Sequence, residues 1–300
     1  MRKNVLVIEG GGANGLLALG AIDAIIMDRG VSFDVVFGTS IGGAIGLALT
    51  SLQVQHKHES QRMLLQRCMV IMSSLKKKDV ISLLPSPYCW TRGGLFTNKV
   101  GRTFGRLVCG NMKLSETTLP VFVGVTDIDA ESEADLLRVI GPHQDYDYRI
   151  ADLVAMTTNV PGLMAGQIDP ATGHRVFDGG VGANNLTSEA FDYIAERGWS
   201  DYHVYIIRLG AYEPEHFKFL PPGRALYQMF NISMRRCEYL SMKISGLYRA
   251  ASLPNFTTIN LPSSAGLINF NPKTSMQVIE QGFNLAKLQL TQSEALAIGG

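Results

Sequence analysis

The chain has 300 residues, of which 46% are hydrophobic and 18% charged, and its formal net charge is +1. This composition is typical of a globular protein with a substantial core and excludes a disordered chain. The near-neutral charge, without a basic patch interleaved with aromatic residues, excludes a general nucleic-acid binder, so we expect no nucleic-acid partner.

The sequence also bears on compartment, membrane topology and metal binding. Its longest nearly apolar stretches, such as 41–52, fall short of the ~20 residues of a membrane span, and the run 5–8 is too short for the core of a signal peptide. The four cysteines are widely spaced, and no histidine pair stands near them: Cys68, Cys89, Cys109 and Cys237. We expect free thiols, no metal site and no cofactor. The predicted location is cytoplasmic and peripheral on membranes, with export by a signal-independent route left open.

The first half of the chain alternates apolar strands with helical patterns, which is typical of an α/β sheet. The pattern predicts strands over 4–8 and 34–38, followed by helices over 15–28 and 41–53. A longer helix is predicted over about 58–76. Residues 80–97 contain two prolines, two adjacent glycines and Trp90, and they predict a loop.

The second half continues the sheet. The predicted elements are a strand over 120–126, a hairpin partner over 134–140, a helix near 149–157 and a strand over 203–208. Residues 211–300 are expected to be helical decoration with a closing strand near 256–260. Because no repeat or low-complexity linker interrupts the chain, we predict one domain over 1–300, with a motif-bearing core over about 3–210.

Two glycine-bracketed turns stand in the first 45 residues. Gly38, Ser40 and Gly42 fit G-x-S-x-G, in which a serine occupies a sharp strand-to-helix turn that requires small neighbours. Before it, Gly10-Gly11-Gly12 and Gly15 follow the first strand and open onto a helix. Their backbone amides form a ready site for negative charge. A nucleophile beside an anion cradle indicates acyl transfer.

The glycine-rich turn has a second interpretation as a dinucleotide-binding fingerprint, because Gly10, Gly12 and Gly15 also satisfy G-x-G-x-x-G. That fingerprint requires an acidic residue at the end of the second strand. Asp34 instead opens this strand, which runs into Gly38-Thr39-Ser40. The expected ribose-binding carboxylate is therefore absent from its place.

A third motif favours acyl transfer. Asp178-Gly179-Gly180 stands far downstream, after the stretch 155–164, which contains Thr157 and Pro161. The order G-G-G-x-x-G, G-x-S-x-G and D-G-G resembles the patatin-like phospholipase family. The stretch 155–164 is similar to that family's A-x-S-x-x-P-x-x-F segment, with Thr for Ser and Met for Phe. Residues 119–127 resemble the family's internal strand that ends in T-D. The likeness extends over about 3–210.

The resemblance implies a mostly parallel central sheet sandwiched by helices, and a Ser–Asp dyad in place of a triad. Carried over residue by residue, Ser40 is the nucleophile, Asp178 the general base, and the amides of Gly10, Gly11 and Gly12 the oxyanion hole. The supporting glycines of the motifs are Gly15, Gly38, Gly42, Gly179 and Gly180. The implied reaction is hydrolysis of carboxylic esters in phospholipids or lysophospholipids.

One position departs from the family pattern. Asn14 stands where the family usually has Arg or Lys. We expect Asn14 to cap the following helix. Without a cation, head-group binding at this position is in doubt.

Two other readings stay open. In a Ser–His–Asp esterase, His174, His203 or His216 would be the base, although Ser40 follows fewer strands than that fold requires. His174 stands four residues before Asp178 and is expected in a surface turn or at the edge of the site. A non-catalytic lipid-binding protein on the same fold is the third reading.

Two segments are candidates for lipid contact. Residues 217–254 carry six cations against one anion, with apolar residues at helical spacing, so a basic amphipathic helix is predicted. The Tyr88–Trp90 loop, with Leu83, Leu84 and Phe96, is a second interface or lid candidate. The expected partner is a lipid or membrane surface, and an activating protein partner stays open.

Overall fold

The computed structural model describes residues 2–82, 84–142, 144–211, 255–262 and 270–298. Eight strands of these residues form one sheet, in the order β10-β9-β1-β2-β4-β8-β7, with β5 paired to β4. Pairs from β10 through β4 are parallel, whereas β5, β7 and β8 run antiparallel to their neighbours. The strands are β1 Lys3–Ile8, β2 Val35–Thr39, β4 Val121–Asp127, β5 Leu137–Ile140, β7 Gln167–Ile168, β8 Arg175–Asp178, β9 Tyr202–Ala211 and β10 Phe256–Pro262.

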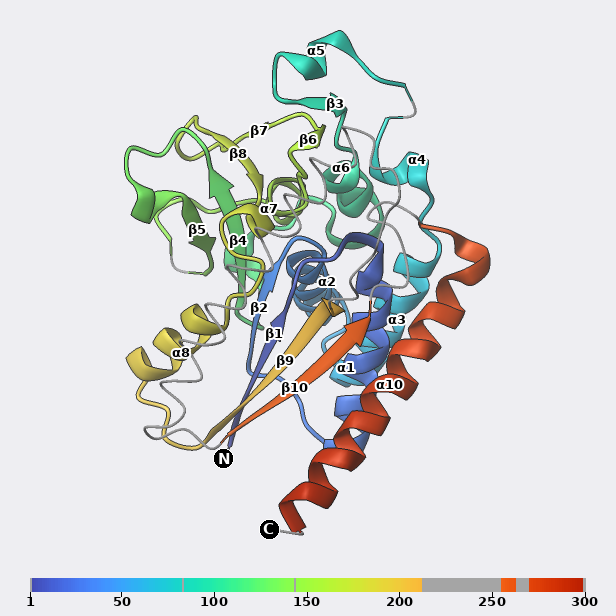
Figure 1. The fold of residues 1–300 in the computed structure, drawn as a ribbon. Helices are drawn as coiled ribbons and strands as arrows, with labels where there is room; N and C mark the ends of the chain where they lie inside the picture. The colour runs from blue at the N-terminus through green and yellow to red at the C-terminus, as the bar shows by residue number, and fades with distance from the viewer. Residues whose placement is uncertain (1, 83, 143, 212–254, 263–269, 299–300) are drawn as a thin grey trace, which may run out of the picture.

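Helices cover both faces of this sheet, as Figure 1 shows. Inner strands buried on both faces read as continuous apolar runs, and β1 is such a strand. Leu6 and Ile8 point into the larger core beneath α1, α2, α3 and α10, while Val5 and Val7 face α8. The helices are α1 Gly15–Arg29, α2 Ile41–Gln55, α3 Gln61–Ser73, α4 Lys77–Val80, α5 Pro87–Trp90, α6 Val100–Phe104, α7 Ile150–Thr157, α8 Thr187–Glu196 and α10 Pro272–Ile298.

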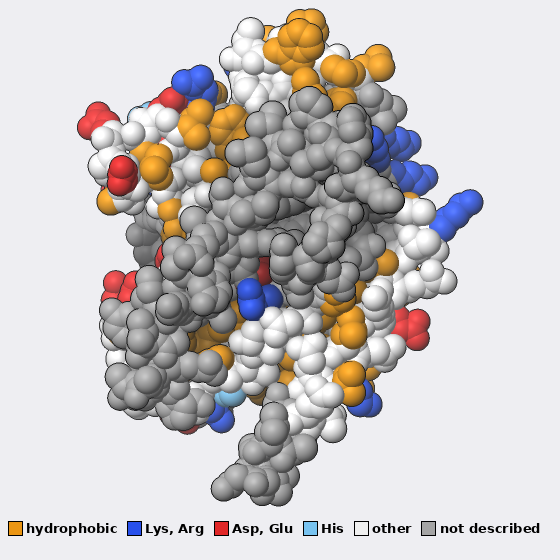
Figure 2. Space-filling view, in the orientation of Figure 1, with side chains coloured by type: hydrophobic (Ala, Val, Ile, Leu, Met, Phe, Trp, Pro, Cys, Tyr) orange, Lys and Arg blue, Asp and Glu red, His pale blue; other side chains and the backbone are white. Residues whose placement is uncertain are grey.

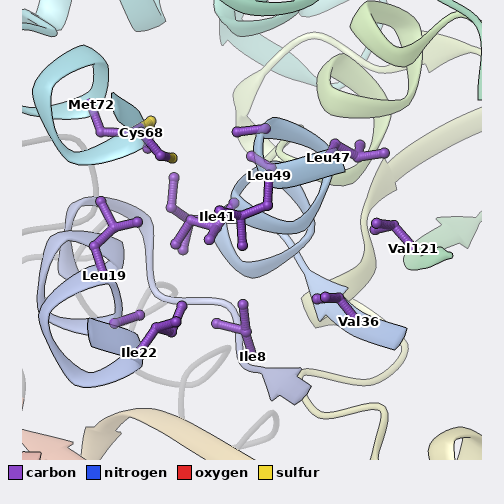
Figure 3. Packing of buried hydrophobic residues seen from close by; sticks show 14 of the residues in the cluster. Ile8, Leu19, Ile22, Val36, Ile41, Leu47, Leu49, Cys68, Met72 and Val121 are labelled. Carbon is purple, nitrogen blue, oxygen red and sulfur yellow. The ribbon is translucent and has the colours of Figure 1, made fainter. Parts of the chain in front are cut away.

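The helix α2 lies at the centre of the larger core (Figure 3). Ile41, Leu47 and Leu49 of this helix are buried among side chains from β1, β2, β4, α1 and α3. A helix that is apolar on all sides is expected where neighbours enclose it. This packing fixes the start of α2, and Ser40 immediately precedes it.

The predicted α/β fold with a mostly parallel sheet is confirmed. The predicted strands over 4–8, 34–38, 120–126, 203–208 and 256–260 correspond to β1, β2, β4, β9 and β10. The hairpin partner at 134–140 is β5, paired antiparallel to β4. The helices predicted over 15–28, 41–53 and 149–157 are α1, α2 and α7.

Other predicted boundaries are wrong. The helix expected over 58–76 is α3, which begins after Ser60 and ends at Ser73, and α4 is a separate turn. The helix begins later than predicted because the Ser60 hydroxyl accepts the Met63 amide as an N-cap. The loop expected over 80–97 contains α5 and the short strand β3 Gly94–Phe96, which pairs with β6 Gly162–Met164.

The helical decoration expected over 211–300 is described only in part. It includes β10 and the long helix α10, and the basic segment 217–254 lies outside the described residues. No helix in the described part of the chain combines the length and apolarity needed to cross a bilayer. The division into a single domain stays a prediction.

Candidate active site

Ser40 occupies the sharp turn between β2 and α2. Its backbone has φ 55° and ψ −123°, and among the described residues no other non-glycine has a positive φ. Such strain persists only where the surroundings hold it. The Ser40 amide donates to Thr157 Oγ1 at 2.9 Å, and that hydroxyl donates to the Gly124 carbonyl at 2.7 Å. A Cβ on Gly42 would lie 2.3 Å from the Ile8 carbonyl oxygen, so the turn requires glycine there.

Strand register brings Ser40 and Asp178 together. Thr39 at the end of β2 is opposite Gly124 of β4, and the next residue, Val125, is opposite Asp178 of β8. Because only β4 separates these two strand ends, residues far apart in sequence meet at one edge of the sheet. The Ser40 hydroxyl donates to Asp178 Oδ2 at 2.5 Å. Their exposed fractions are 7% and 5%.

The Asp178 carboxylate has few partners besides Ser40. Its Oδ1 accepts the Gly180 amide at 2.8 Å. Burial raises the pKa of Asp178 to about 6, although the bonds from Ser40 and Gly180 oppose this change. The carboxylate is therefore largely ionised at neutral pH, yet it binds a proton more readily than an exposed aspartate.

The backbone of Asp178 is fixed by neighbouring strands. Its amide donates to the Asn159 carbonyl at 2.9 Å, and its carbonyl accepts the Thr126 hydroxyl at 2.9 Å. A Cβ on Gly179 would lie 2.2 Å from the Gly124 carbonyl oxygen. The glycine after the aspartate is therefore what allows β8 to approach β4 so closely.

The glycine-rich turn after β1 lies against Ser40. A Cβ on Gly10 would lie 3.0 Å from the Ser40 Cβ. The Gly10 amide donates to the Asn184 carbonyl at 3.4 Å. The Gly11 and Gly12 amides have no acceptor among the described residues. Of the three predicted donors, Gly11 and Gly12 are thus available to a bound anion, whereas Gly10 is already engaged.

Buried polar groups hold this turn in place. Glu9, which is 1% exposed, accepts the Asn185 side-chain amide at 2.6 Å and the Leu209 backbone amide at 3.1 Å. Arg208 also forms an ion pair with Glu9, at 3.4 Å. A fully desolvated carboxylate with three such partners fixes the backbone on which Gly10 begins.

An apolar cavity opens from Ser40. It has a volume of about 680 Å³, including the part open to solvent, and Gly12, Ser40 and Thr158 line it at the Ser40 end. Beyond them the walls are almost wholly apolar and come from α2, α3, α4, α6, residues 105–109 and the β6 region. These apolar residues include Ala44, Met72, Leu75, Val80, Phe104, Val108, Val160 and Met164. Such a cavity suits an aliphatic chain.

The other predicted glycines surround these groups. Gly15 lies against the Ile41 side chain, Gly38 lies beneath the Gly42–Gly43 backbone, and Gly180 donates to Asp178. Asn14 stands at the N-cap position of α1, but its side chain makes no capping hydrogen bond, so the capping hypothesis is wrong. Asn14 is 6% exposed.

Two of the three candidate triad bases, His174 and His203, lie in the described part of the chain, and neither is placed as the base of a triad. His174 Nδ1 lies 3.0 Å from Asp127 Oδ2, four residues or roughly 13 Å along β8 from Asp178. His203 is in register with Asn4, six residues or about 20 Å before the level of Ser40, and it contacts Thr257 at 2.9 Å. Burial lowers the pKa of His203 to about 4. His216 lies outside the described residues.

Sequence reasoning missed several supporting residues. Glu9, Asn159 and Asn185 carry no motif of their own. A carboxylate closing an apolar strand is nevertheless a signal for Glu9, because such a group must find partners when buried. In the parts of the chain that are described, no group of three or more His, Cys, Asp or Glu side chains could hold a metal ion. Cys68, Cys89 and Cys109 are free thiols.

The fold and this site define an α/β protein in which a serine on a strand-to-helix turn donates a hydrogen bond directly to an aspartate. The family model described as patatin-like phospholipase matches residues 6–191. The chain therefore belongs to the patatin-like phospholipase family, and lipid acyl hydrolysis is the activity at family level. The predicted membership is confirmed.

Two curated relatives and one solved structure are similar to parts of the chain. Patatin-like phospholipase domain-containing protein 6 of Homo sapiens is 30% identical over 184 residues, and protein 7 of Mus musculus is 27% identical over 184. Each match covers 61% of this chain but 12% of the relative, so the chain corresponds to a small part of either protein. VipD from Legionella pneumophila has 15% sequence identity and a TM-score of 0.47, covering 97% of this chain and 67% of that one.

Proposed function

We propose that this chain hydrolyses carboxylic esters of phospholipids or lysophospholipids, with Ser40 as nucleophile and Asp178 as general base. The observation that carries the proposal is the 2.5 Å hydrogen bond from Ser40 Oγ to Asp178 Oδ2, at the mouth of an apolar cavity. A serine hydroxyl is a weak nucleophile until a positioned base accepts its proton. A carboxylate with its pKa raised to about 6 is suited to that exchange.

The reaction then proceeds in two halves. Ser40 Oγ attacks the ester carbonyl carbon and transfers its proton to Asp178. The carbonyl oxygen becomes an oxyanion, which the Gly11 and Gly12 amides are free to bind; one such donor is worth about 3 kcal/mol. The intermediate collapses, the alcohol leaves with the proton from Asp178, and the acyl group stays on Ser40.

Water completes the cycle. The water oxygen attacks the acyl-enzyme while Asp178 accepts a proton from the water. Asp178 then returns this proton to Ser40 Oγ when the fatty acid leaves. The apolar walls beyond Ser40 support an aliphatic acyl chain as the group that is transferred. Burying each further methylene is worth about 0.8 kcal/mol, so longer chains are favoured until the cavity is full.

Mass spectrometry of the products tests the proposal directly. Wild type and Ser40→Ala are incubated with a mixed lipid extract and, separately, with a monomeric short-chain ester. We expect wild type to release fatty acid and the matching lysolipid or glycerol compound, and Ser40→Ala to release neither. Thermal unfolding must show that the variant is folded. An inert wild type would favour the lipid-binding reading, and an active, folded Ser40→Ala would refute the nucleophile.

A further inference from the structure

The segment between Ser82 and Thr97 projects from the body of the molecule, at the top of Figure 1. Its base is closed by backbone hydrogen bonds from the Ser82 amide to Thr97 at 3.0 Å and from the Lys99 amide to Val80 at 2.9 Å. Its strand β3 pairs with β6, near the cavity residue Met164. The described residues of this segment, 82 and 84–97, therefore form an ordered projection.

Large apolar side chains stand exposed on this projection. Leu84 is 78% exposed, the highest fraction among the large apolar residues described, and Tyr88 and Trp90 are each 63% exposed. The turn of α5 buries Cys89 between them, at 2%, and thereby directs both aromatic rings outward. Figure 2 shows hydrophobic side chains gathered over α5 and β3. A concentration of this kind marks a contact surface.

Cationic residues are concentrated in the sequence on either side of the same projection. The sequence between 76 and 106 has seven cationic residues and one acidic residue: Lys76, Lys77, Lys78, Arg92, Lys99, Arg102 and Arg106 against Asp79. The whole chain has a net charge of +1, so the remainder is acidic on balance. Lys77 and Lys78 are exposed and form no ion pair with any described residue. Lys and Arg side chains are visible beside α4 in Figure 2.

We propose that the 82–97 projection and the α4 lysines form the surface on which the protein docks to an anionic lipid bilayer. Trp and Tyr favour the membrane interface, where one part of the ring is apolar and the other hydrated. Lysines beside them match the charge of anionic head groups. Exposed apolar side chains next to exposed lysines are complementary to the apolar interior and to the anionic head groups of such a bilayer.

The docking surface and the cavity share structural elements. Leu75 before α4 and Val80 at its end line the cavity that opens from Ser40, and Met164 of β6, which pairs with Phe96, lines it too. Docking through the projection therefore places the cavity close to the lipid phase. The inference rests on the proposed function only in taking lipid as the substrate.

Vesicle binding tests the docking surface without hydrolysis. The 300-residue chain with Ser40→Ala is floated with vesicles of phosphatidylcholine alone or mixed with phosphatidylserine. We expect partitioning onto the anionic vesicles. Because each lysine near an anionic surface is worth about fivefold in affinity, Lys77→Glu/Lys78→Glu should lower partitioning at least about tenfold. Tyr88→Ser/Trp90→Ser should lower it by a similar factor.

Matched controls remove the same chemistry elsewhere. Lys57→Glu/Lys287→Glu changes the charge equally, and Met27→Ser/Leu288→Ser removes exposed apolar side chains from α1 and α10. Both should bind as the parent does. Docking at this surface is refuted if the parent does not partition onto anionic vesicles or if the 77/78 and 88/90 variants partition as well as the parent. It is also refuted if the control variants lose as much partitioning as those variants.

Tryptophan emission reports insertion directly, since Trp90 and Trp199 are the two tryptophans of the chain. Trp199 packs against Tyr193 on the α8 side, so Trp199→Phe leaves Trp90 as the reporter. Its emission should shift to the blue with anionic vesicles, and an unchanged spectrum would contradict insertion. When Ser40 is kept, the Lys77→Glu/Lys78→Glu and Tyr88→Ser/Trp90→Ser variants should hydrolyse a monomeric ester at the wild-type rate. Loss of docking thus stays distinguishable from failure of the proposed chemistry.

Discussion

Two buried aspartates flank β8, with Asp169 before the turn into the strand and Asp178 at its last residue. Asp169 is fully buried and contacts the Arg138 guanidinium, the Tyr148 hydroxyl at 3.0 Å and the Ala171 amide at 2.8 Å. Burial pushes its pKa up, but these partners together hold the pKa below its ordinary value. Asp178 has no cationic partner among the described residues, and burial raises its pKa to about 6.

The difference shows that burial alone does not decide how a carboxylate binds protons. The two groups also affect stability with opposite dependence on pH. The pKa of Asp178 is raised on folding, so its contribution to stability falls as pH rises from about 4 to about 6. The pKa of Asp169 is lowered, so its contribution is present above the ordinary value and lost as pH falls. One carboxylate is suited to exchange a proton, and the other to hold a charge.

The largest effect is expected from Asp178→Asn. Removing the base should lower kcat/KM on an ester by about 10³-fold, within the usual range for general-base catalysis. Because an amide cannot ionise, the variant should also unfold at a higher temperature than wild type at pH 7, with the gain vanishing near pH 4. Ester kinetics and thermal unfolding measure the two effects. A comparable loss of kcat/KM in His174→Ala, together with an active Asp178→Asn variant, would favour the Ser–His–Asp triad instead.

The second prediction concerns the other aspartate. Arg138→Met should destabilise the protein by about 3–5 kcal/mol, since it leaves the Asp169 charge buried without its cation. Activity per folded molecule should be unchanged. Arg149→Met is the matched control, because its partner Asp152 is solvent-accessible, and the cost there should be at most about 1 kcal/mol. Equal denaturant midpoints for the two variants would contradict the assigned role of Asp169.

The sequence predicted the parts of the site that depend on local backbone geometry. Ser40 requires a preceding strand, a following helix and small neighbours within five residues, and this pattern can be recognised in one short stretch of sequence. The central strands can be predicted in the same way, because strands buried on both faces must be apolar throughout. Asp178 needed the resemblance, since its meeting with Ser40 depends on the register of β2, β4 and β8.

What the sequence did not reveal depends on contacts between distant segments. Asn185 binds Glu9 across 176 residues of chain, and no local pattern announces such a pair. The projection lies within residues 80–97, for which two prolines, two adjacent glycines and Trp90 predict a loop. Its strand β3 exists through pairing with β6, which is a tertiary effect. The sequence also could not show that the Gly10 amide is already hydrogen-bonded, because its acceptor is the carbonyl of the distant residue Asn184.

A pH profile sharpens the comparison further. With Asp178 as base, kcat/KM should fall about tenfold per pH unit below about 6, since protonation of the carboxylate removes the acceptor. The fold should persist through that range, because the Asp169 charge is lost at lower pH. Circular dichroism at each pH separates the two events. A midpoint that moves in Arg138→Met would mean that Asp169 and not Asp178 controls the titration.

The smallest effects are expected at Thr157, whose hydroxyl links the Ser40 amide to the Gly124 carbonyl. Thr157→Val keeps the shape but removes the acceptor of the buried Ser40 amide, which costs about 1–3 kcal/mol. Because the Ser40 backbone is strained, kcat should fall about tenfold or more, with little change in KM. Thr157→Ser keeps the hydroxyl and restores the residue typical of the family, so its kcat should stay within about threefold of wild type. Parallel kinetics and unfolding of the two variants measure this. If Thr157→Val lost stability without losing kcat, Thr157 would support the fold and not the position of Ser40.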